Sequence, residues 1–241
     1  MPDIRSQLYE RYVSTFKHGN ASLTPAELAH YYRWCDARYF PILQDLPKTS
    51  SILELGCGHG RILSYLREKD FTNVKGIDIS EEQIALARKD GLDAERIDVF
   101  EYLNRQSPSS LDGVIAIDLV EHFTKEELLQ LFELLHTVIK PNGVLLLQTV
   151  NGEGLFPRQI IYGDLTHSTI LSPGSMSQLL STTRFHDMKY SECSPLASGL
   201  KGMVRAIAWK MIRAGANSIR LIESNKTQSI WTENFICSAR R

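Results

Sequence analysis

Residues 51–150 alternate short apolar runs with helical patterns, and no other feature restricts the fold as much. The apolar runs are predicted to be strands and lie at 51–55, 74–78, 94–97, 113–117 and 144–150. Strands that are apolar on both faces are typical of a parallel sheet with helices on either side. Because crossovers between parallel strands are right-handed, the sheet should be doubly wound. We therefore predict an α/β fold.

The segments around this core are predicted from their end signals. Thr24-Pro25-Ala26-Glu27 places a capping box and a helix-starting proline before a helix over about 25–40, which Pro41 should end. Residues 1–50 are expected to form an N-terminal helical cap, and residues 151–241 the acceptor-binding segment. In that segment we expect a helix over 172–181, a strand over 186–193, a helical insertion at about 196–229 and a final strand at about 230–238.

Composition excludes several classes of protein. The 241 residues include 27 Lys+Arg and 28 Asp+Glu, a balance that argues against a nucleic-acid partner. No apolar run approaches the roughly 18–20 residues of a spanning helix. Charged residues interrupt residues 1–12, so a signal peptide is not expected there. Four widely spaced cysteines indicate neither a disulfide framework nor a zinc site, and we expect a cytoplasmic protein.

A glycine cluster follows the first predicted strand in Ile52-Leu-Glu-Leu-Gly-Cys-Gly-His-Gly-Arg61. Gly56, Gly58 and Gly60 let a ligand approach the backbone beside a helix N-terminus. A nicotinamide or flavin loop would have G-x-G-x-x-G, whereas the third glycine here comes one position early. Glu54 would also repel a diphosphate and favour a cationic group. The remaining alternative is an ordinary tight turn.

Acidic residues stand at the ends of four successive predicted strands: Glu54, Asp78, Asp98 and Asp118. Ligands of open α/β sheets bind at the carboxyl ends of the strands. Any one of these acids alone could be a helix cap or a solvated turn residue. Four in register instead predict a single acid-lined crevice.

These segments resemble the class I S-adenosylmethionine-dependent methyltransferases. The resemblance rests on Glu54-Leu-Gly-Cys-Gly-His-Gly60, Gly76-Ile-Asp-Ile-Ser80, Ile97-Asp-Val99 and Asp118-Leu-Val-Glu-His122. It implies a seven-stranded sheet whose last strand is antiparallel, and S-adenosylmethionine as the cofactor. The cofactor carries a sulfonium and an ammonium, both of which an acid-lined pocket complements.

The same resemblance implies how the cofactor is held. Residues 56–60, with Gly56, Cys57, Gly58 and Gly60, would pass along its methionine part. Asp78 would hold the ribose, Asp98 the adenine amino group, and Asp118 would lie near the methionyl ammonium. The other residues expected at the cofactor are Ile79, Val99 and His122, with Arg33 or Tyr32 reaching its carboxylate from the N-terminal helix.

The methyl acceptor is expected near Tyr162-Gly-Asp-Leu-Thr-His167. His167 would be the general base for a hydroxyl and Asp164 would orient its ring, although both can also be ordinary loop residues. This segment resembles bacterial methyltransferases of surface polysaccharides and the ubiquinone-biosynthesis O-methyltransferase group. O-methylation of a sugar or glycan hydroxyl is therefore expected. The alternatives are a quinone or phenol acceptor, or a catalytically silent binding subunit.

No metal is expected. Asp164, Glu153 and Asn151 offer ligand atoms, but no spacing among them indicates a metal site.

Residues 200–213 form a basic amphipathic pattern on a helical wheel. One side holds Leu200, Met203, Val204, Ile207, Ala208 and Met211, and the other holds Lys201, Arg205, Lys210 and Arg213. Such a helix can lie weakly on a membrane surface, at its inner face for a cytoplasmic protein. It can also cover a core edge or a homodimer interface with its polar side in water.

Overall fold

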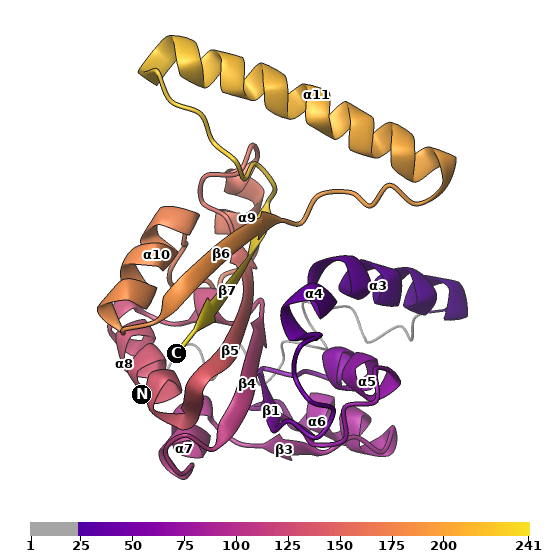
Figure 1. Cartoon of the computed structure of the whole chain (residues 1–241), viewed down its shortest axis with the longest axis vertical. Helices are drawn as coiled ribbons and strands as arrows, with labels where there is room; N and C mark the ends of the chain where they lie inside the picture. The colour runs from indigo at the N-terminus through magenta and orange to yellow at the C-terminus, as the bar shows by residue number, and fades with distance from the viewer. Residues whose placement is uncertain (1–23) are drawn as a thin grey trace.

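A computed structural model describes residues 24–241 and shows one seven-stranded sheet in the order β3-β2-β1-β4-β5-β7-β6 (Figure 1). The strands are β1 (Ile52–Leu55), β2 (Val74–Asp78), β3 (Ala94–Arg96), β4 (Leu111–Ile117), β5 (Ile139–Val150), β6 (His186–Glu192) and β7 (Asn234–Arg240). Strands β1 to β5 pair in parallel, and β7 is antiparallel to both β5 and β6. The predicted α/β sheet and its antiparallel strand are confirmed.

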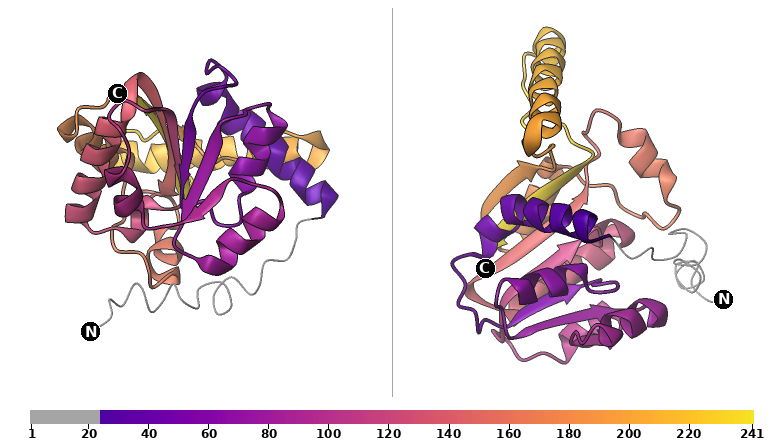
Figure 2. Two further views of the ribbon diagram at one scale, coloured as in Figure 1. Left: turned by 90° about the horizontal axis from the view of Figure 1, so that it is seen from below. Right: turned by 90° about the vertical axis from the view of Figure 1, so that its right-hand side faces the viewer.

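Helices cover both faces of the sheet (Figures 1 and 2). One layer contains α3 (Pro25–Arg38), α4 (Phe40–Leu43), α5 (Arg61–Glu68) and α6 (Glu81–Lys89). The other contains α7 (Val99–Asn104), α8 (Lys125–Val138) and α10 (Pro173–Thr182). The sheet is therefore doubly wound, as predicted.

Strand β5 shows why the core runs were apolar throughout. Leu145 and Leu147 pack in the cluster under α8 and α10, whereas Val144 and Leu146 pack in the cluster under α3 to α5. Successive side chains of a strand point to opposite faces, so a strand buried on both sides needs an apolar residue at every position.

Helix starts follow their predicted caps with one exception. Thr24 and Thr124 form complete capping boxes with Glu27 and Glu127. Before α6, the Ser80 side chain accepts from the Gln83 amide as expected. The capping box predicted at Ser80 is not completed, because the Gln83 side chain lies at the glycine loop, 3.2 Å from the His59 ring.

Three boundaries differ from the predictions. Pro41 does not end the N-terminal helical region, because it sits in the first turn of α4, where a proline needs no amide hydrogen. β5 begins at Ile139, with the expected turn at Asn142 (φ 64°) as an irregularity inside the strand. β7 starts at Asn234, three residues later than the apolar alternation from Trp231 indicated.

Besides α10, two helices follow the core. α9 (Pro157–Gly163) was not predicted, and α11 (Gly199–Ser224) is one 26-residue helix across most of the expected insertion. α11 stands apart from the sheet (Figure 2) and has no buried residue. The expectation that its apolar side covers a core edge is therefore wrong. No helix within residues 24–241 is long and apolar enough to cross a membrane.

Candidate active site

A cavity of about 1500 Å³ opens at the carboxyl ends of β1, β2 and β4, and residues of α3, α9 and α11 complete its walls. Nine of the predicted site residues line it: Glu54, Gly56, Cys57, Gly58, Asp78, Asp118, His122, Asp164 and His167. The sheet topology thus brings most of the predicted cofactor residues and both predicted catalytic residues to one cavity.

The glycine loop holds the Asp78 carboxylate. Gly58 adopts a positive φ of 55° and donates its amide to Asp78 Oδ2 at 2.9 Å. The Ser80 amide donates to the other oxygen, Oδ1, at 2.8 Å. Two backbone amides thus hold this carboxylate, a group that only accepts hydrogen bonds when ionised, at the end of β2.

Glu54 presents a buried acid to the same cavity. Its side chain is 3% exposed, and its Oε2 atom has no hydrogen-bond partner within the described part of the chain. Burial, with the nearby Asp78 charge, raises the pKa of Glu54 well above its usual range. A cationic ligand group would supply the missing partner and stabilise the ionised form. Glu54 therefore fits a cofactor with a positively charged end.

Asp118 follows β4 in a left-handed conformation with φ 50°. The Gln148 side chain donates to both of its oxygens, at 3.1 and 3.3 Å, and Asn234 donates to Oδ1 at 2.9 Å. Gln148 in turn accepts from the Tyr39 hydroxyl at 2.8 Å. No sequence signal indicated Gln148 or Asn234, because only the pairing of β5 with β4 and β7 brings them to Asp118.

Two predicted adenine-side residues do not line the cavity. Asp98 is exposed and caps α7, accepting from the Phe100 amide at 2.8 Å and the Glu101 amide at 3.2 Å. Val99 is buried in the core. Asp98 thus has the helix-cap role that any single strand-end acid could have.

Three further predicted residues also lie outside the cavity lining. Ile79 is 41% exposed, and Gly60 (φ 85°) begins α5 against Leu92. Arg33 is exposed and lines a separate cavity of about 480 Å³.

Helix α3 instead contributes Tyr31 and Trp34 to the main cavity. Among the described residues, the Lys and Arg side chains that line this cavity are Arg61 and Arg205. Tyr32 packs its ring against Tyr65, with centroids 5.5 Å apart.

The turn after β4 is tied to the segment that carries His167. The Glu121 carbonyl oxygen accepts from the amides of Ser168 and Thr169, at 2.8 and 3.0 Å. His122 Nδ1 lies 3.0 Å from Thr166 Oγ1, whose hydroxyl donates to Asp164 Oδ1 at 2.6 Å. Asp164 therefore positions Thr166 and, through it, His122.

His167 is oriented by a backbone carbonyl. Its Nδ1 lies 3.0 Å from the Ile160 carbonyl oxygen, which can only accept, so Nδ1 carries a hydrogen. In the neutral ring Nε2 is then the proton acceptor. The sequence predicted that Asp164 orients the His167 ring. In the structure the Ile160 carbonyl oxygen contacts the ring instead.

Glu121 is a buried acid for which the sequence predicts no role. It is 1% exposed and accepts from the Thr149 hydroxyl at 2.9 Å. Burial, with the Asp118 charge, raises its pKa to about 8. The only sequence signal for Glu121 was its position before His122 in the motif Asp118-Leu-Val-Glu-His122.

Glu121, His122 and His167 offer ligand atoms that all lie within 4.8 Å of one another. Carboxylate and imidazole ligands suit several divalent ions, so this trio could hold a metal. Asn151, which the sequence offered as a further ligand, donates its side-chain amide to the Thr232 carbonyl at 2.9 Å instead.

Comparisons with known proteins agree with this geometry. Residues 28–190 match the family described as a methyltransferase domain. Cyclopropane mycolic acid synthase 1 of Mycobacterium tuberculosis is 30% identical over 115 residues, 46% of this chain and 39% of that one. A ubiquinone biosynthesis O-methyltransferase of Paracidovorax citrulli is 26% identical over 155 residues, 54% of this chain and 64% of that one. The chain thus spans 39% and 64% of the length of these two curated relatives, less than two thirds of either.

Among solved structures, a SAM-dependent methyltransferase from Archaeoglobus fulgidus superposes with a TM-score of 0.67 at 20% identity, over 98% of this chain and 99% of that one. This likeness shows a shared fold. The family match covers most of the chain, and the glycine loop, Asp78 and the orphan oxygen of Glu54 fit a ribose-bearing, cationic cofactor. The chain therefore belongs to the methyltransferase-domain family and has the class I fold of its S-adenosylmethionine-dependent members.

Proposed function

We propose that this protein transfers a methyl group from S-adenosylmethionine to a hydroxyl oxygen of a sugar or glycan. The observation that carries the proposal is the orientation of His167. The Ile160 carbonyl fixes the hydrogen on Nδ1, so Nε2 of a cavity-lining histidine is a proton acceptor. A hydroxyl acceptor needs such a group because its oxygen must lose a proton during transfer.

The cofactor would be held by residues of β1, β2 and the loops that follow them. Asp78, fixed by two backbone amides, would accept from the ribose hydroxyls, and Glu54 would face the cationic methionine end. Arg61, on the same cavity wall, would balance the cofactor carboxylate. When bound, the cofactor supplies a methyl group on a positively charged sulfur, which is a good leaving group.

The chain would then align the acceptor and move one proton. The acceptor hydroxyl would donate to His167 Nε2, and its oxygen would be held in line with the methyl group. Asp164, Thr166 and His122 would keep this segment in place through their hydrogen bonds.

The residue types that line the cavity favour a polar substrate with flat faces. The cavity walls include the aromatic side chains of Trp34, Phe156, Trp209 and Trp231, and also the polar side chains of Gln159 and Asn234. Aromatic faces with adjacent hydrogen-bonding groups suit sugar rings. They also suit a quinone or phenol, the acceptor class that the name of the Paracidovorax relative indicates for that protein.

A metal-assisted form of the same reaction is the second candidate. The observation in its favour is the trio of Glu121, His122 and His167. A divalent cation there would bind the acceptor oxygen and lower its pKa, and His167 would then be a ligand instead of the base.

The proposal is tested by incubating the protein with isotope-labelled S-adenosylmethionine and a panel of nucleotide sugars, glycans and phenols. Methyl transfer to a sugar hydroxyl, located by NMR of the product, is the expected result. Transfer to phenols alone would favour the quinone or phenol alternative, and transfer to carbon or nitrogen would contradict O-methylation. Calorimetric cofactor binding with no product from the whole panel would instead favour a silent binding subunit.

A further inference from the structure

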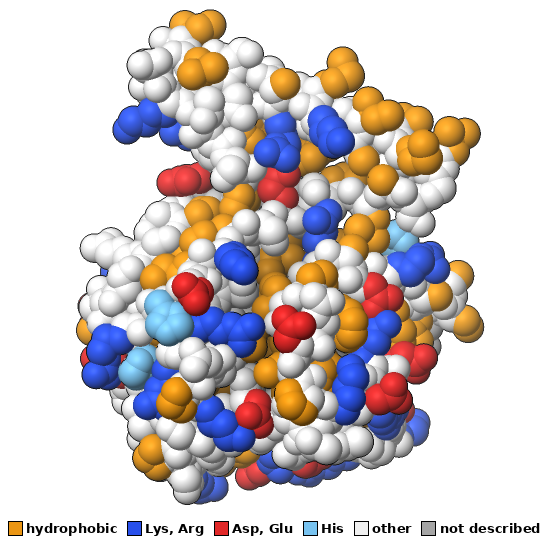
Figure 3. All heavy atoms as spheres, viewed as in Figure 1, with side chains coloured by type: hydrophobic (Ala, Val, Ile, Leu, Met, Phe, Trp, Pro, Cys, Tyr) orange, Lys and Arg blue, Asp and Glu red, His pale blue; other side chains and the backbone are white. Residues whose placement is uncertain are grey.

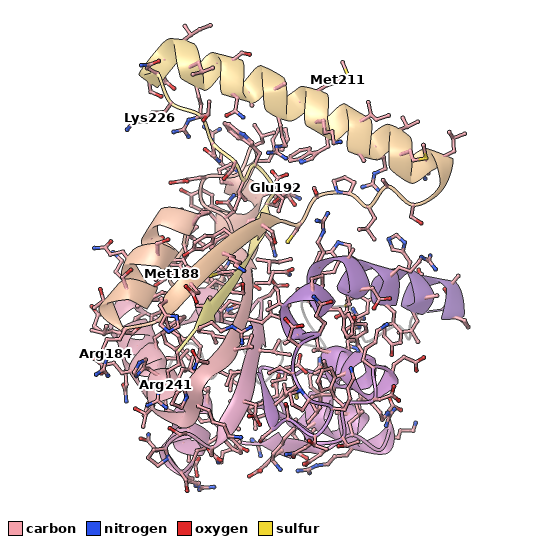
Figure 4. All side chains as sticks on the ribbon, in the orientation of Figure 1. Arg184, Met188, Glu192, Met211, Lys226 and Arg241 are labelled. Atoms are coloured by element: carbon pink, nitrogen blue, oxygen red, sulfur yellow. The ribbon has the colours of Figure 1, made fainter. Side chains whose placement is uncertain are left out.

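Helix α11 carries a continuous apolar surface that faces away from the rest of the molecule. Its members are 48–89% exposed, and we call them the outer face: Leu200, Met203, Val204, Ile207, Met211, Ile212, Ile219, Leu221 and Ile222. In Figure 3 hydrophobic side chains gather along the far edge of this helix, and Figure 4 shows Met211 pointing away from the body. At 1.5 Å per residue the helix is about 39 Å long. Exposed apolar surfaces of this extent mark interaction sites.

The opposite side of α11 is fixed to the body by polar contacts. Arg213 Nη1 and Trp209 Nε1 both donate to Glu192 Oε2, at 2.9 and 3.1 Å, and Glu192 is only 8% exposed. Arg213 also donates to the Ser229 carbonyl at 2.9 Å. Rolling the outer face inward would remove the positive charge of Arg213 from the buried carboxylate of Glu192, a strongly unfavourable change. These polar contacts therefore keep the outer face of α11 turned away from the body.

The charges of α11 identify the surface that it complements. The helix contains Lys201, Arg205, Lys210, Arg213 and Arg220 against a single acid, Glu223. Lys201 and Lys210 are exposed and border the outer face on its two sides, so their ammonium groups can reach past it. An apolar face bordered by lysines matches the boundary between acyl chains and anionic headgroups.

We propose that the outer face of α11 docks this protein on the surface of an anionic lipid bilayer, with the helix lying in the plane of the interface. Arg205 and Trp209 of α11 also line the main cavity. Docking would therefore place the cavity beside the bilayer, within reach of an acceptor anchored in lipid. The docking itself does not depend on the proposed methyl transfer.

The test is co-sedimentation of the full chain with vesicles of phosphatidylcholine and phosphatidylglycerol, compared with vesicles of phosphatidylcholine alone. We expect clear binding to the anionic vesicles. Ile207→Asp/Met211→Asp should lower the partition coefficient about tenfold or more, since it charges the centre of the outer face. Lys201→Gln/Lys210→Gln should lower it roughly thirtyfold on anionic vesicles only, at about 1 kcal/mol for each lysine. Leu129→Asp is the matched control, because Leu129 is an exposed apolar residue (39%) on α8.

Thermal unfolding of each variant checks that it folds, and the lysine variant leaves the apolar surface intact. Wild-type protein that stays in the supernatant with anionic vesicles would overturn the proposal. So would equal binding of wild type and Ile207→Asp/Met211→Asp. A wild-type dimer that this double variant dissociates, without vesicle binding, would assign the outer face to a second copy of the chain and also overturn the proposal. Cofactor binding by calorimetry is measured separately, so failure to dock cannot be mistaken for failure of the active site.

Discussion

The rings of His122 and His167 lie side by side, with their centroids 5.1 Å apart, although the two residues are far apart in the sequence. Each ring directs Nδ1 to a residue between 160 and 166. The turn after β4 and the loop after α9 are thus joined by the contact of His122 with Thr166 and by the hydrogen bonds that the Ser168 and Thr169 amides donate to the Glu121 carbonyl oxygen. His167, the predicted base, therefore lies next to His122 of the motif Asp118-Leu-Val-Glu-His122.

Asp78→Ala should abolish most cofactor affinity. The substitution removes the acceptor for the ribose and leaves the amides of Gly58 and Ser80 without their carboxylate partner. Hydrogen bonds to charged groups contribute about 1.5–3 kcal/mol each, so the Kd should rise at least tenfold. Titration calorimetry with S-adenosylhomocysteine measures it. An unchanged Kd would place the ribose elsewhere.

Asp98→Ala distinguishes a helix-capping role of Asp98 from a role in cofactor binding. Because Asp98 caps α7 from an exposed position, its loss should cost about 1 kcal/mol and lower Tm by about 2–4 °C. The Kd for S-adenosylhomocysteine should change less than in Asp78→Ala. A stable variant with a large loss of affinity would instead support the adenine contact that the family resemblance implied.

Gly60→Ala should destabilise the fold. Gly60 has φ 85°, and a Cβ atom there would lie 2.3 Å from Leu92 Cδ1. Left-handed strain and overpacking together predict a loss of about 2–4 kcal/mol. Gly215→Ala in α11 is the matched control, since nothing lies within 4 Å of its added Cβ, and it should be neutral or stabilising by up to about 1 kcal/mol. Urea unfolding of both variants measures the difference, and equal effects would contradict the account.

Burial of Glu121 should make stability depend on pH. Its pKa is about 8 in the folded chain, against 4.5 for an ordinary glutamate. Between these values the folded chain keeps a proton that the unfolded chain has lost. The contribution of Glu121 to the free energy of unfolding should therefore fall as pH rises, by at most about 1.4 kcal/mol per pH unit, and level off above pH 8.

Glu121→Gln removes this titration and keeps the shape of the side chain. The difference in free energy of unfolding between wild type and variant should move in favour of the variant from pH 5 to pH 8. Urea unfolding with EDTA present, so that no cation occupies the trio, gives this difference. A constant difference across the range would contradict the raised pKa.

The sequence was most informative where backbone conformation and burial both restrict the residue type. The apolar strands, the glycine loop and Asp78 could be predicted because few other residues satisfy those positions. Asp98 was assigned to the adenine amino group from the resemblance, although the same carboxylate at a strand end serves equally as a helix cap, which is its role in the structure. Glu121 and Gln148 were missed because their roles arise from partners that only the folded sheet supplies.

The orientation of α11 also lay beyond the sequence. A helical wheel gives the apolar and basic sides of the helix, but which side meets the body depends on Glu192 and on residues 228–229 that follow the helix. Those contacts reverse the usual arrangement, in which the apolar side packs inward.

The central claim is tested most directly by the turnover of His167→Ala with S-adenosylmethionine and an accepted hydroxyl substrate, measured next to cofactor affinity. General-base catalysis contributes typically 10²–10⁴-fold, so kcat should fall by about that factor while the Kd for S-adenosylhomocysteine stays unchanged. EDTA should leave wild-type turnover intact if His167 is the base, and abolish it if the histidine is a metal ligand. Undiminished kcat for His167→Ala at neutral pH would contradict the account.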